Sequence, residues 1–401
     1  MHWQILIALV LAVIFGYFAP QWVKYVAWTG DIFLRALKMI IIPLIFSSII
    51  SGVTNMGESQ NLRRLSLKTI LYYISTSTIA IITGLVIVNS VQPGVGADLG
   101  FEKSVENLAE ESITVKDFFT RLIPDNIVEA MSKGDILPII FFAILFGYFI
   151  SVSRIKYKNS LTTFFNAMFE VMMKLTLLII KFAPIGIFGI VAGEVATNSE
   201  NLASIAGSLA IYTLCVVGGL LFHAFISLPL IMRFVGKARP FAHMKNMATA
   251  LLTAFSTASS NATLPLTIDA LENNTGVSNR ISSFILPLGA TINMDGTALY
   301  ECMAAMFIAQ VYGVGLAFGQ QILLVVLALL TSIGVAGVPM ASLIMLVVVL
   351  NTMGLPLEGI GLILTVDRIL DMIRTSVNVW SDSCGAVVIA RSENELTNVA
   401  L

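Results

Sequence analysis

The sequence carries little charge. Only 12% of its 401 residues are Asp, Glu, Lys or Arg, whereas a soluble domain carries about 25%. A chain with so few charged side chains lacks the polar surface that a water-soluble protein of this size needs. The formal net charge is −1, so no basic excess marks the chain as a nucleic-acid binder.

Residues that hold metals or form disulfides are also scarce. The three cysteines are odd in number, far apart and set in apolar segments, so we expect neither a disulfide framework nor a CxxC metal site. No HExxH pair is present, which argues against a zinc enzyme. The residues concerned are Cys215, Cys302, Cys384, His2, His223 and His243.

Long uncharged runs are what the sequence has in place of charge, since 57% of its residues are hydrophobic. Two of these runs, 70–91 and 203–232, exceed the roughly 18 residues that read as a membrane span. The run nearest the N-terminus, 5–19, is expected to be a span and not a removed signal, because no basic region or small-residue cleavage site accompanies it. The runs cover residues 5–19, 70–91, 136–152, 203–232 and 321–331.

The loop charges alternate along the first six predicted spans. Basic residues gather in loops 55–68 and 153–159, whereas the stretch 92–120 is rich in acid. Because cytoplasmic loops carry an excess of Lys and Arg, both basic loops and the N-terminus are predicted to be cytoplasmic. The predicted spans lie near 4–28, 31–54, 69–91, 134–153, 160–193 and 202–233.

Two later segments do not read as simple spans. Residues 241–275 contain the polar run Ser256–Asn261, which cannot lie in hydrocarbon without unsatisfied polar groups. Residues 320–353 are apolar on both sides of a Gly- and Pro-containing break at 334–339. Each segment is predicted to be two half-helices that meet at a tip, an arrangement typical of a transporter binding site. A Pro/Gly kink in an ordinary span is the alternative.

A polar motif, Asn293-Met294-Asp295-Gly296-Thr297, lies between these two segments. A carboxylate at membrane depth is costly and usually functional. We expect Gly296 to let the backbone leave helical geometry and to free carbonyl oxygens, which together with the carboxylate would suit Na+. Glu301, six residues after Asp295, could carry a proton.

The last long helix, predicted over about 356–391, has one polar face. At 100° per residue its polar side chains fall within a stripe of roughly 80°, with Arg368 outside it. Such charges could merely hold helices together, but five polar groups exceed what a packing bridge requires. The stripe consists of Asp367, Asp371, Arg374, Asn378 and Asp382.

The charges of this stripe match an acidic amino acid, which has two carboxylates and one ammonium. Arg374 can bind the side-chain carboxylate in bidentate fashion. Asp371, one turn away, can take the ammonium. The main carboxylate can use N–H donors near Ser260 at a helix N-terminus, together with Asn378.

Five motifs carry a resemblance to a known family. They are YYISTST at 72–78, SSNATLP at 259–265, NMDGTALYE at 293–301, GVAGVP at 334–339 and DRILDMIRTSVNVWSD at 367–382. Together they resemble the glutamate/aspartate transporter family, the dicarboxylate/amino acid:cation symporters, and a prokaryotic-type member among them. The resemblance implies an all-α membrane protein with eight transmembrane helices, two re-entrant helical hairpins, a homotrimeric assembly and an elevator motion.

The resemblance also implies a division into scaffold and transport domains. Residues 1–66 would form scaffold helices 1 and 2, and residues 67–92 transport-domain helix 3. Residues 93–233 would hold an extracellular loop, scaffold helices 4 and 5 and transport-domain helix 6. The transport core at 234–401 would contain hairpin 1 at about 241–275, helix 7 at about 279–311, hairpin 2 at about 320–353 and helix 8 at about 356–391.

Site residues follow from the same resemblance. One Na+ site would use Tyr73, Thr76, Ser77, Asn293 and Asp295. A second would use Asn378 and Asp382 with backbone oxygens near Asn293. A third would use Thr291, Met294 and carbonyls in the region Ser332–Val335. The substrate would contact Ser260, Thr297, Val338, Asp371, Arg374, Thr375 and Asn378.

The sequence departs from the family pattern in the first tip and in the last helix. Family members place a supporting Arg where this chain has Ala258 or Met372, so Asp367 must pair with Arg374 or with another group. Asn261 stands where the family often has Ser. Glu301 matches the acid that is linked to ions in proton- and K+-coupled members, which suggests H+ cotransport and K+ countertransport.

The resulting hypothesis is a Na+-coupled secondary symporter of aspartate or glutamate, in the inner membrane with both termini cytoplasmic. Neutral amino acid carriers of the family usually lack the Arg at 374, and C4-dicarboxylate carriers usually lack the Asp at 371, so these remain the alternatives within the family. An anion channel is the alternative from another class. An intramembrane enzyme is disfavoured, because no Ser–Lys, GxGD or HExxH arrangement is present.

Overall fold

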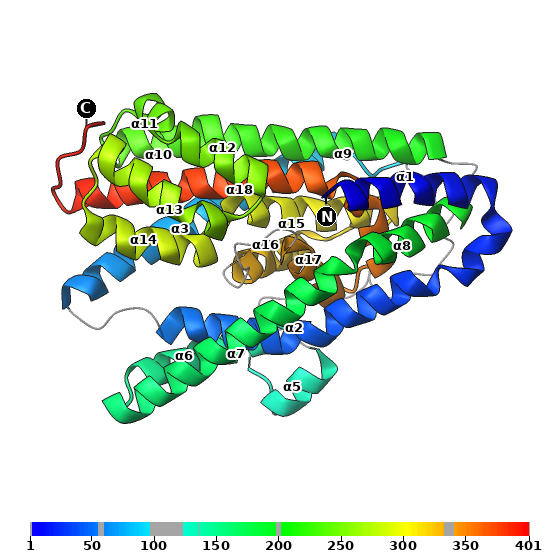
Figure 1. Ribbon diagram of the computed structural model, residues 1–401, viewed down its shortest axis with the longest axis horizontal. Helices are drawn as coiled ribbons and strands as arrows, with labels where there is room; N and C mark the ends of the chain where they lie inside the picture. The colour runs from blue at the N-terminus through cyan, green and yellow to red at the C-terminus, as the bar shows by residue number, and fades with distance from the viewer. Residues whose placement is uncertain are drawn as a thin grey trace.

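The computed structural model describes residues 2–54, 60–96, 123–134, 136–197, 202–332 and 341–400. Every regular element within these ranges is a helix (Figure 1), apart from a single antiparallel bridge between Ala238 and Ala400. The prediction of an all-α protein is therefore confirmed at this level.

The first group of helices packs around α2. Helix α1 packs on α8, and α2 packs on α6, α7 and α8. In Figure 1 helices α2, α6, α7 and α8 follow one oblique arm of the molecule. The members of this group are α1 (His2–Phe18), η1 (Pro20–Tyr25), α2 (Trp28–Thr54), α5 (Ile127–Lys133), α6 (Ile136–Ser151), α7 (Ile155–Lys181) and α8 (Ala183–Thr197).

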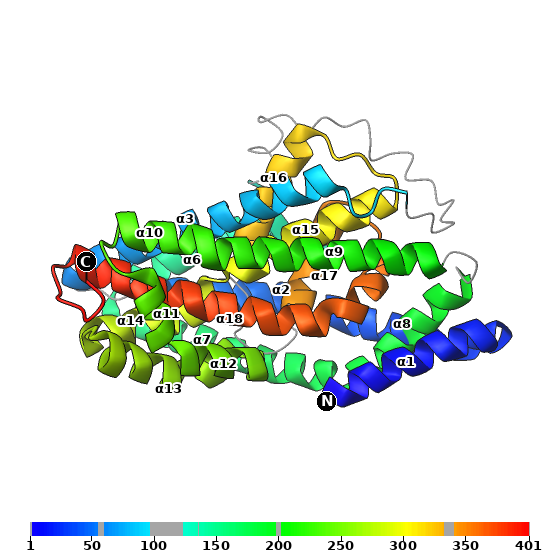
Figure 2. The ribbon, with the colours of Figure 1, turned by 90° about the horizontal axis from the view of Figure 1, so that it is seen from above.

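The second group forms around α15 and α18. Helix α15 packs on α3, and α18 packs on α9, α12, α14 and α15. Figure 2 shows α9 and α18 side by side along most of their length. The members are α3 (Gln60–Val91), α9 (Leu202–Phe222), η2 (His223–Ser227), α10 (Leu228–Phe234), α11 (Pro240–Asn246), α12 (Ala248–Thr257), α13 (Ser260–Asp269), η3 (Ala270–Thr275), α14 (Asn279–Ile292), α15 (Asp295–Val311), α16 (Phe318–Ser332), α17 (Ala341–Thr352), η4 (Leu357–Gly359) and α18 (Ile360–Ser392).

Helix α15 is the centre of this second group. All its residues from Asp295 to Val311 are buried except Gln310. A helix that is buried all round has to satisfy its polar side chains inside the protein. The acidic residues of α15 must therefore find their partners on neighbouring helices.

Two predicted spans are divided in the structure. The segment predicted over 4–28 leaves helical geometry at Ala19, and the one over 160–193 is broken at Phe182. Pro20 disfavours helical geometry in Ala19 directly before it. Pro184, two residues after Phe182, lacks the N–H that would continue the hydrogen bonds of α7. Each of these two predicted spans is therefore interrupted in the structure.

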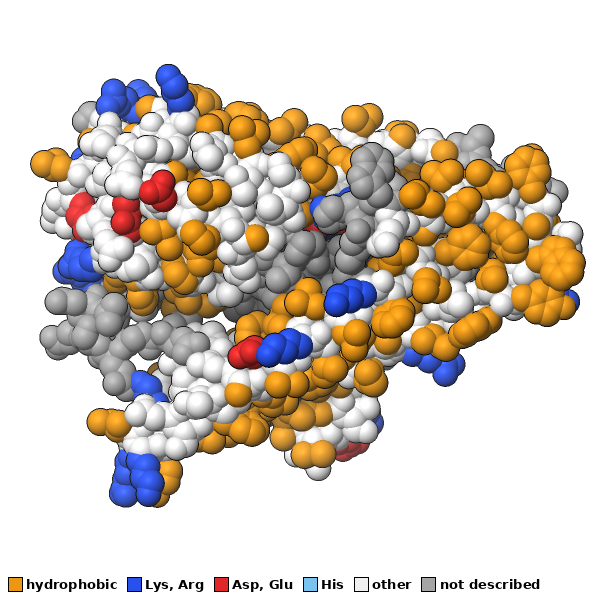
Figure 3. All heavy atoms as spheres, viewed as in Figure 1, with side chains coloured by type: hydrophobic (Ala, Val, Ile, Leu, Met, Phe, Trp, Pro, Cys, Tyr) orange, Lys and Arg blue, Asp and Glu red, His pale blue; other side chains and the backbone are white. Residues whose placement is uncertain are grey.

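Three stretches of the described residues are long and apolar enough to cross a membrane: 64–91, 155–179 and 206–234. Six further apolar helices have 10–17 residues each. Figure 3 shows hydrophobic side chains over much of one face, with charged groups at the end formed by α10, α11, α13 and α14 and others along the arm that holds α2, α6 and α7. Exposed apolar side chains such as Phe18, Leu214 and Phe234 suit helices in contact with lipid.

Helices α12 and α13 run antiparallel. The chain turns at Ala258, whose φ is 49°, and Ser259 caps α13 by accepting the Ala262 N–H. At the far end, the amide of each of Asn246 and Asn274 donates to the carbonyl of the other, at 3.0 and 3.1 Å. Helices α16 and α17 also pack together, and the segment between them, 333–340, lies outside the described residues.

The segment after α18 joins several elements at one end of the molecule. The Glu393 carboxylate pairs with Lys68 at 2.5 Å and with Arg64, both on α3. The backbone N–H of Asn398 donates to the carbonyl of Thr275 at 2.8 Å. The last residues therefore fasten the start of α3 to the end of α18 and to η3.

Candidate functional site

The polar stripe of α18 faces the interior. Its five members are between 1% and 6% exposed, although they include four charged side chains. Buried charges are tolerated only where partners or bound ions compensate them. The contacts of these side chains divide into two clusters, which we call the Asp295 cluster and the Arg374 cluster.

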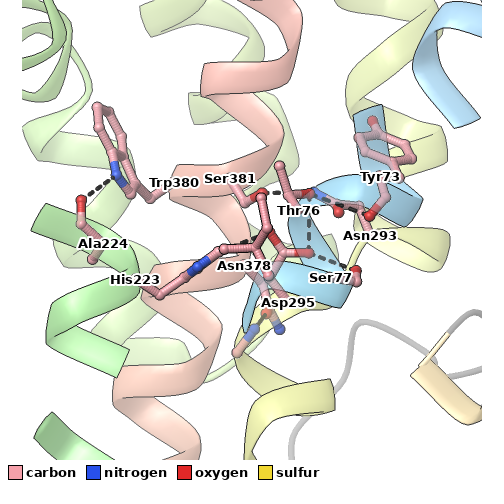
Figure 4. Close-up of polar contacts among 12 residues, drawn as sticks. Tyr73, Thr76, Ser77, His223, Ala224, Asn293, Asp295, Asn378, Trp380 and Ser381 are labelled. Carbon is pink, nitrogen blue, oxygen red and sulfur yellow. Dashed lines mark hydrogen bonds and ion pairs between the residues drawn. The ribbon is translucent and has the colours of Figure 1, made fainter. Parts of the chain in front are cut away.

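In the Asp295 cluster, three hydroxyls and one imidazole surround one carboxylate (Figure 4). Oδ1 accepts hydrogen bonds from Ser77 at 2.6 Å and from Thr76 at 3.3 Å. Oδ2 accepts from Ser381 at 2.6 Å and lies 3.1 Å from Nε2 of His223. Asp295 is fully buried, and no Lys or Arg of the described residues forms an ion pair with it. Its partners are three hydroxyls and one imidazole.

A second carboxylate adjoins the first. The amide of Asn293 donates to Asp382 at 2.8 Å and to the Ser381 hydroxyl at 3.1 Å, so Ser381 belongs to both arrangements. A side chain at Gly289 would place its Cβ 2.4 Å from Asp382 Oδ1 and 2.7 Å from the Tyr73 hydroxyl oxygen. Only glycine therefore leaves room for α18 and α3 to approach α14 this closely.

The position of the helix break corrects the role expected for Gly296. The backbone leaves helical geometry at Asn293 and Met294, which end α14 and precede α15. Gly296 lies within α15, and its N–H donates to Asn378 at 2.8 Å. A Cβ at Gly296 would lie 2.9 Å from the carbonyl oxygen of Arg374. Close packing against α18, and not an unwound backbone, is what requires glycine here.

The Arg374 cluster contains the charged pairs. Arg374 lies 3.0 Å from Asp367 through Nη1 and 3.0 Å from Asp371 through Nη2. Nη2 also donates to the Ser342 hydroxyl at 2.9 Å. The guanidinium carbon lies 3.6 Å from the centroid of the Tyr300 ring, close enough for a cation–π interaction. Arg374 is thus held from three helices, α15, α17 and α18.

Arg368, which falls outside the predicted stripe, completes this cluster. Its Nη1 lies 3.4 Å from Oδ2 of Asp371, and the residue is 7% exposed. Residues three apart on a helix are neighbours, and a long side chain can reach back over that distance. Two arginines and two aspartates therefore alternate, and their formal charges cancel.

Other residues expected at the substrate lie in the same region. The Asn378 amide donates to the Thr297 hydroxyl at 3.2 Å, which joins α18 to α15. The Thr375 hydroxyl donates to the carbonyl of Asp371 at 2.8 Å. Ser260 is 5% exposed and is the first residue of α13. Val338 lies outside the described residues.

The third expected cation site is not assembled within the described residues. The hydroxyls of Thr291 and Ser332 donate to carbonyls in their own helices, at 3.0 and 2.8 Å. Met294 is buried at the break between α14 and α15. The carbonyls at 333–335, which the expected site also needs, are not among the residues described.

Glu301 is buried on α15 and faces α16. Its Oε2 accepts a hydrogen bond from the Thr331 hydroxyl at 2.7 Å. Its Oε1 has no hydrogen-bond partner among the residues that the structure describes. A carboxyl in such surroundings is cheaper to keep protonated than ionised, which is the property that the sequence hypothesis requires.

Sequence reasoning missed several partners of these clusters. Ser381 lies near the α18 stripe, three residues after Asn378, and could have been found from the helical period. His223 was read as an isolated histidine, because its contact depends on a turn of π-helix that leaves no compositional signal. Tyr300 and Ser342 looked like ordinary helix residues.

Comparison with known proteins decides the family. A model of the sodium:dicarboxylate symporter family matches residues 1–392. The chain belongs to this family. Its members are transporters, so the protein is a membrane transporter and not an enzyme.

Bacterial and animal members of the symporter family match nearly the whole chain. The proton/glutamate-aspartate symporter of Escherichia coli is 36% identical, over 98% of this chain and 93% of its own length. The proton/sodium-glutamate symport protein of Geobacillus stearothermophilus is 38% identical, over 98% and 94%. Excitatory amino acid transporter 3 of Mus musculus is 35% identical, over 98% and 86%.

Proposed function

We propose that this chain is a secondary active symporter that carries aspartate or glutamate across the membrane together with Na+. The observation that carries the proposal is the pair of adjoining clusters in the core. The Arg374 cluster offers arginines and aspartates to a zwitterion with an extra carboxylate. The Asp295 cluster offers cations two carboxylates that no Lys or Arg of the described residues neutralises. The names of the three relatives, each an acidic amino acid carrier, support the same function.

Substrate binding would exchange partners within the Arg374 cluster. Arg374 and Asp371 now contact each other at 3.0 Å. The substrate's distal carboxylate would take Arg374 and its ammonium would take Asp371, so both buried charges would stay paired throughout. Asp367 would keep Arg374 in place as its charge partner. The remaining proposed contacts are Ser260, Thr297, Val338, Thr375 and Asn378.

The Asp295 cluster has the chemistry of a Na+ site, because hard cations prefer carboxylate, hydroxyl and carbonyl oxygens. A hydroxyl that donates to a carboxylate keeps its lone pairs, so Ser77 and Thr76 can hold Asp295 and face a cation together. We assign this first site to Tyr73, Thr76, Ser77, Asn293 and Asp295. A second site is assigned to Asn378 and Asp382, and a third to Thr291, Met294 and Ser332.

Charge balance links the two clusters. The Arg374 cluster is formally neutral, and an acidic amino acid adds one negative charge to it. Asp295 and Asp382 add two more at the neighbouring cluster. Burying these charges together is unfavourable unless cations enter with the substrate, which gives a physical reason for coupling. Glu301 is the proposed carrier of H+, and K+ is proposed to return in exchange.

The proposed architecture is that of an elevator. Helices α1, α2 and α5–α8 would be the scaffold, and α3 with α9–α18 the moving transport domain. The packing supports this division, because each group makes most of its contacts within itself. We further propose eight transmembrane helices, the hairpins α12–α13 and α16–α17, a homotrimer and an inner-membrane location with cytoplasmic termini.

Uptake into proteoliposomes tests the function. Labelled aspartate and glutamate are supplied under Na+, K+ and pH gradients that are imposed one at a time. We expect saturable accumulation that requires an inward Na+ gradient. No accumulation under any gradient would reject the symporter. Flux that neither saturates nor accumulates would favour the anion channel, and stronger competition by serine or succinate than by aspartate would favour the other substrate classes.

A further inference from the structure

The described residues contain one fully buried histidine that contacts the Asp295 cluster, and no role has been given to it so far. His223 is 0% exposed, and its Nε2 lies 3.1 Å from Oδ2 of Asp295. Figure 4 shows its ring approaching the carboxylate from the side of η2, opposite Ser77. His223 comes from a helix that contributes nothing else to this cluster.

The backbone at this histidine is unusual. His223 begins η2 (His223–Ser227), a π-helical turn between α9 and α10. Such turns are rare and often occur at functional sites, because the wider turn re-aims side chains and changes the carbonyl pattern. Here the carbonyl of Ala224 accepts the indole N–H of Trp380 on α18 at 2.9 Å. The π-helical turn is therefore fixed directly to α18.

The hydrogen bond between Trp380 and Ala224 fixes the relative positions of His223 and Ser381, the two groups that contact Oδ2 of Asp295. Trp380 is followed in sequence by Ser381, whose hydroxyl donates to Oδ2 of Asp295 at 2.6 Å. Fixing η2 to Trp380 thus holds His223 and Ser381 on the same carboxylate oxygen. His223 and Ser381 both contact Oδ2 of Asp295, whereas Oδ1 accepts hydrogen bonds from Thr76 and Ser77.

The two oxygens of Asp295 consequently have different tasks. Hydroxyls around Oδ1 can donate to the carboxylate and still offer lone pairs to a cation. An imidazole N–H that donates to Oδ2 has no lone pair on that nitrogen, so His223 cannot ligate the cation in this geometry. The Nδ1 of His223 has no partner among the described residues, and Nε2 lies 3.1 Å from a carboxylate oxygen, which can only accept, so we place the ring N–H on Nε2.

We propose that His223 is a positioning residue for cation binding: it holds Oδ2 of Asp295 so that Oδ1 faces the Na+ coordinated by Thr76 and Ser77. Groups of this kind orient the direct ligands of a metal, and their loss typically lowers metal affinity by about 10–100-fold. The inference rests on the proposed Na+-coupled function and adds to it a residue outside the ligand set.

The test compares two amides at position 223. In His223→Gln the side-chain nitrogen can reach the place of Nε2, whereas in His223→Asn it falls short, near the place of Nδ1. We expect the half-saturating Na+ concentration for aspartate uptake to rise about tenfold in His223→Asn and less than about threefold in His223→Gln. The maximal rate at saturating Na+ should change little in either variant.

His243→Gln is the matched control. His243 is also fully buried, and its ring lies 5.3 Å from Trp380, but it contacts Thr275 at 3.1 Å and not Asp295. We expect its Na+ dependence to equal that of the unmodified protein. An equal shift in His243→Gln, or equal shifts in the Gln and Asn variants at 223, would overturn the proposal.

Na+ binding is also measured without transport, as the thermal stabilisation of the detergent-solubilised protein when NaCl replaces choline chloride. The Asn variant should need about tenfold more Na+ than the Gln variant for the same stabilisation. If the unmodified protein binds Na+ but does not accumulate aspartate, the proposed function fails and this comparison still decides the role of His223. The role of His223 would be rejected if the unmodified protein, His223→Gln and His223→Asn showed identical stabilisation at every Na+ concentration. It would also be rejected if Na+ stabilised none of these three proteins.

Discussion

The Asp295 cluster and the Arg374 cluster are buried to the same degree, but their carboxylates have different kinds of partner. Asp295 is 0% exposed and Asp367 is 1% exposed. Asp367 lies against an arginine, whereas Asp295 is met by hydroxyls and an imidazole. The Arg374 cluster therefore supplies its own positive charge, whereas the Asp295 cluster has no Lys or Arg partner among the described residues. On the proposed function, this difference places the amino acid at the Arg374 cluster and the cations at the Asp295 cluster.

The largest effect is expected from Arg374→Cys, which removes the cation of the self-compensated cluster. Breaking a buried pair costs about 3–5 kcal/mol because it leaves a buried charge unpaired, so aspartate uptake should fall by at least about 100-fold. Uptake of labelled aspartate and serine measures the change, and the preference should move to serine. A variant that still preferred aspartate would contradict the role of Arg374.

Asp295→Asn should have the next largest effect, because it removes the charge of the other cluster and keeps the shape. We expect the half-saturating Na+ concentration to rise by about 100-fold, since the direct ligand is changed and not its support. Na+-dependent uptake and Na+-dependent thermal stabilisation both measure it. Asp31→Asn, at an exposed position on α2, is the control. An Asp295→Asn protein with unaltered Na+ dependence would remove the distinction between the clusters.

Glu301→Gln tests a carboxyl that belongs to neither cluster. Gln can still accept the hydrogen bond of Thr331 but cannot ionise, so Na+-driven uptake should persist while its response to pH and to internal K+ disappears. Uptake at several external pH values, with and without internal K+, measures this response. If both responses survive the substitution unchanged, Glu301 does not carry the proton.

Arg368→Met tests whether substrate binding depends on the zero formal charge of the Arg374 cluster. The change removes one of the two arginines that pair with Asp371 and makes the cluster negative, so an acidic substrate should bind more weakly, with a KM raised about fivefold. Arg368→Lys keeps the charge and should lie between Met and the unmodified protein. Uptake kinetics for aspartate provide the KM. An unchanged KM in Arg368→Met would show that Arg368 acts only in packing.

Glu393→Gln extends the comparison to a carboxylate near water and should have the smallest effect. Its pairs with Lys68 and Arg64 include exposed partners, so the loss should not exceed about 1 kcal/mol. The hydrogen bond from Lys68 holds the pKa of Glu393 below its usual value. A carboxylate with a lowered pKa stabilises the fold above its ordinary pKa, and this contribution disappears as the pH falls through the lower, folded value.

The melting temperature in detergent, followed from pH 7 to a pH below the lowered pKa of Glu393, measures this contribution. The difference between the unmodified protein and Glu393→Gln should be largest at pH 7 and should shrink on acidification. Glu358→Gln, at an exposed position, is the control and should show no such trend. A difference that grows as the pH falls would contradict the sign of this linkage.

The Arg374 cluster was largely visible in the sequence, and the Asp295 cluster only in part. Asp367, Asp371 and Arg374 follow one helical period, so counting residues along a single helix brings them together. The donors to Asp295 come from α3, η2 and α18, which no local pattern relates. The motif at 293–297 marked the carboxylate but not what would surround it.

Two residues show the limit of a pattern read along one helix. Arg368 lies outside the stripe by its helical position, and its long flexible side chain reaches back to Asp371. Gly296 was taken as the point of helix unwinding, although the break is at Asn293 and Met294. In both cases the sequence indicated an unusual residue, but its task depended on a neighbouring helix that the local pattern does not describe.

The C-terminal segment has a consequence for how the protein is made. Glu393 and Lys68 are 325 positions apart, so the start of α3 gains this anchor only after the residues of both clusters have been synthesised. A chain that stopped before Glu393 would contain all the binding residues yet lack the fastening of α3 to α18. Completeness of the binding residues and fastening of the helices that hold them are thus separate requirements, and the second depends on a segment that, among the described residues, contacts neither cluster.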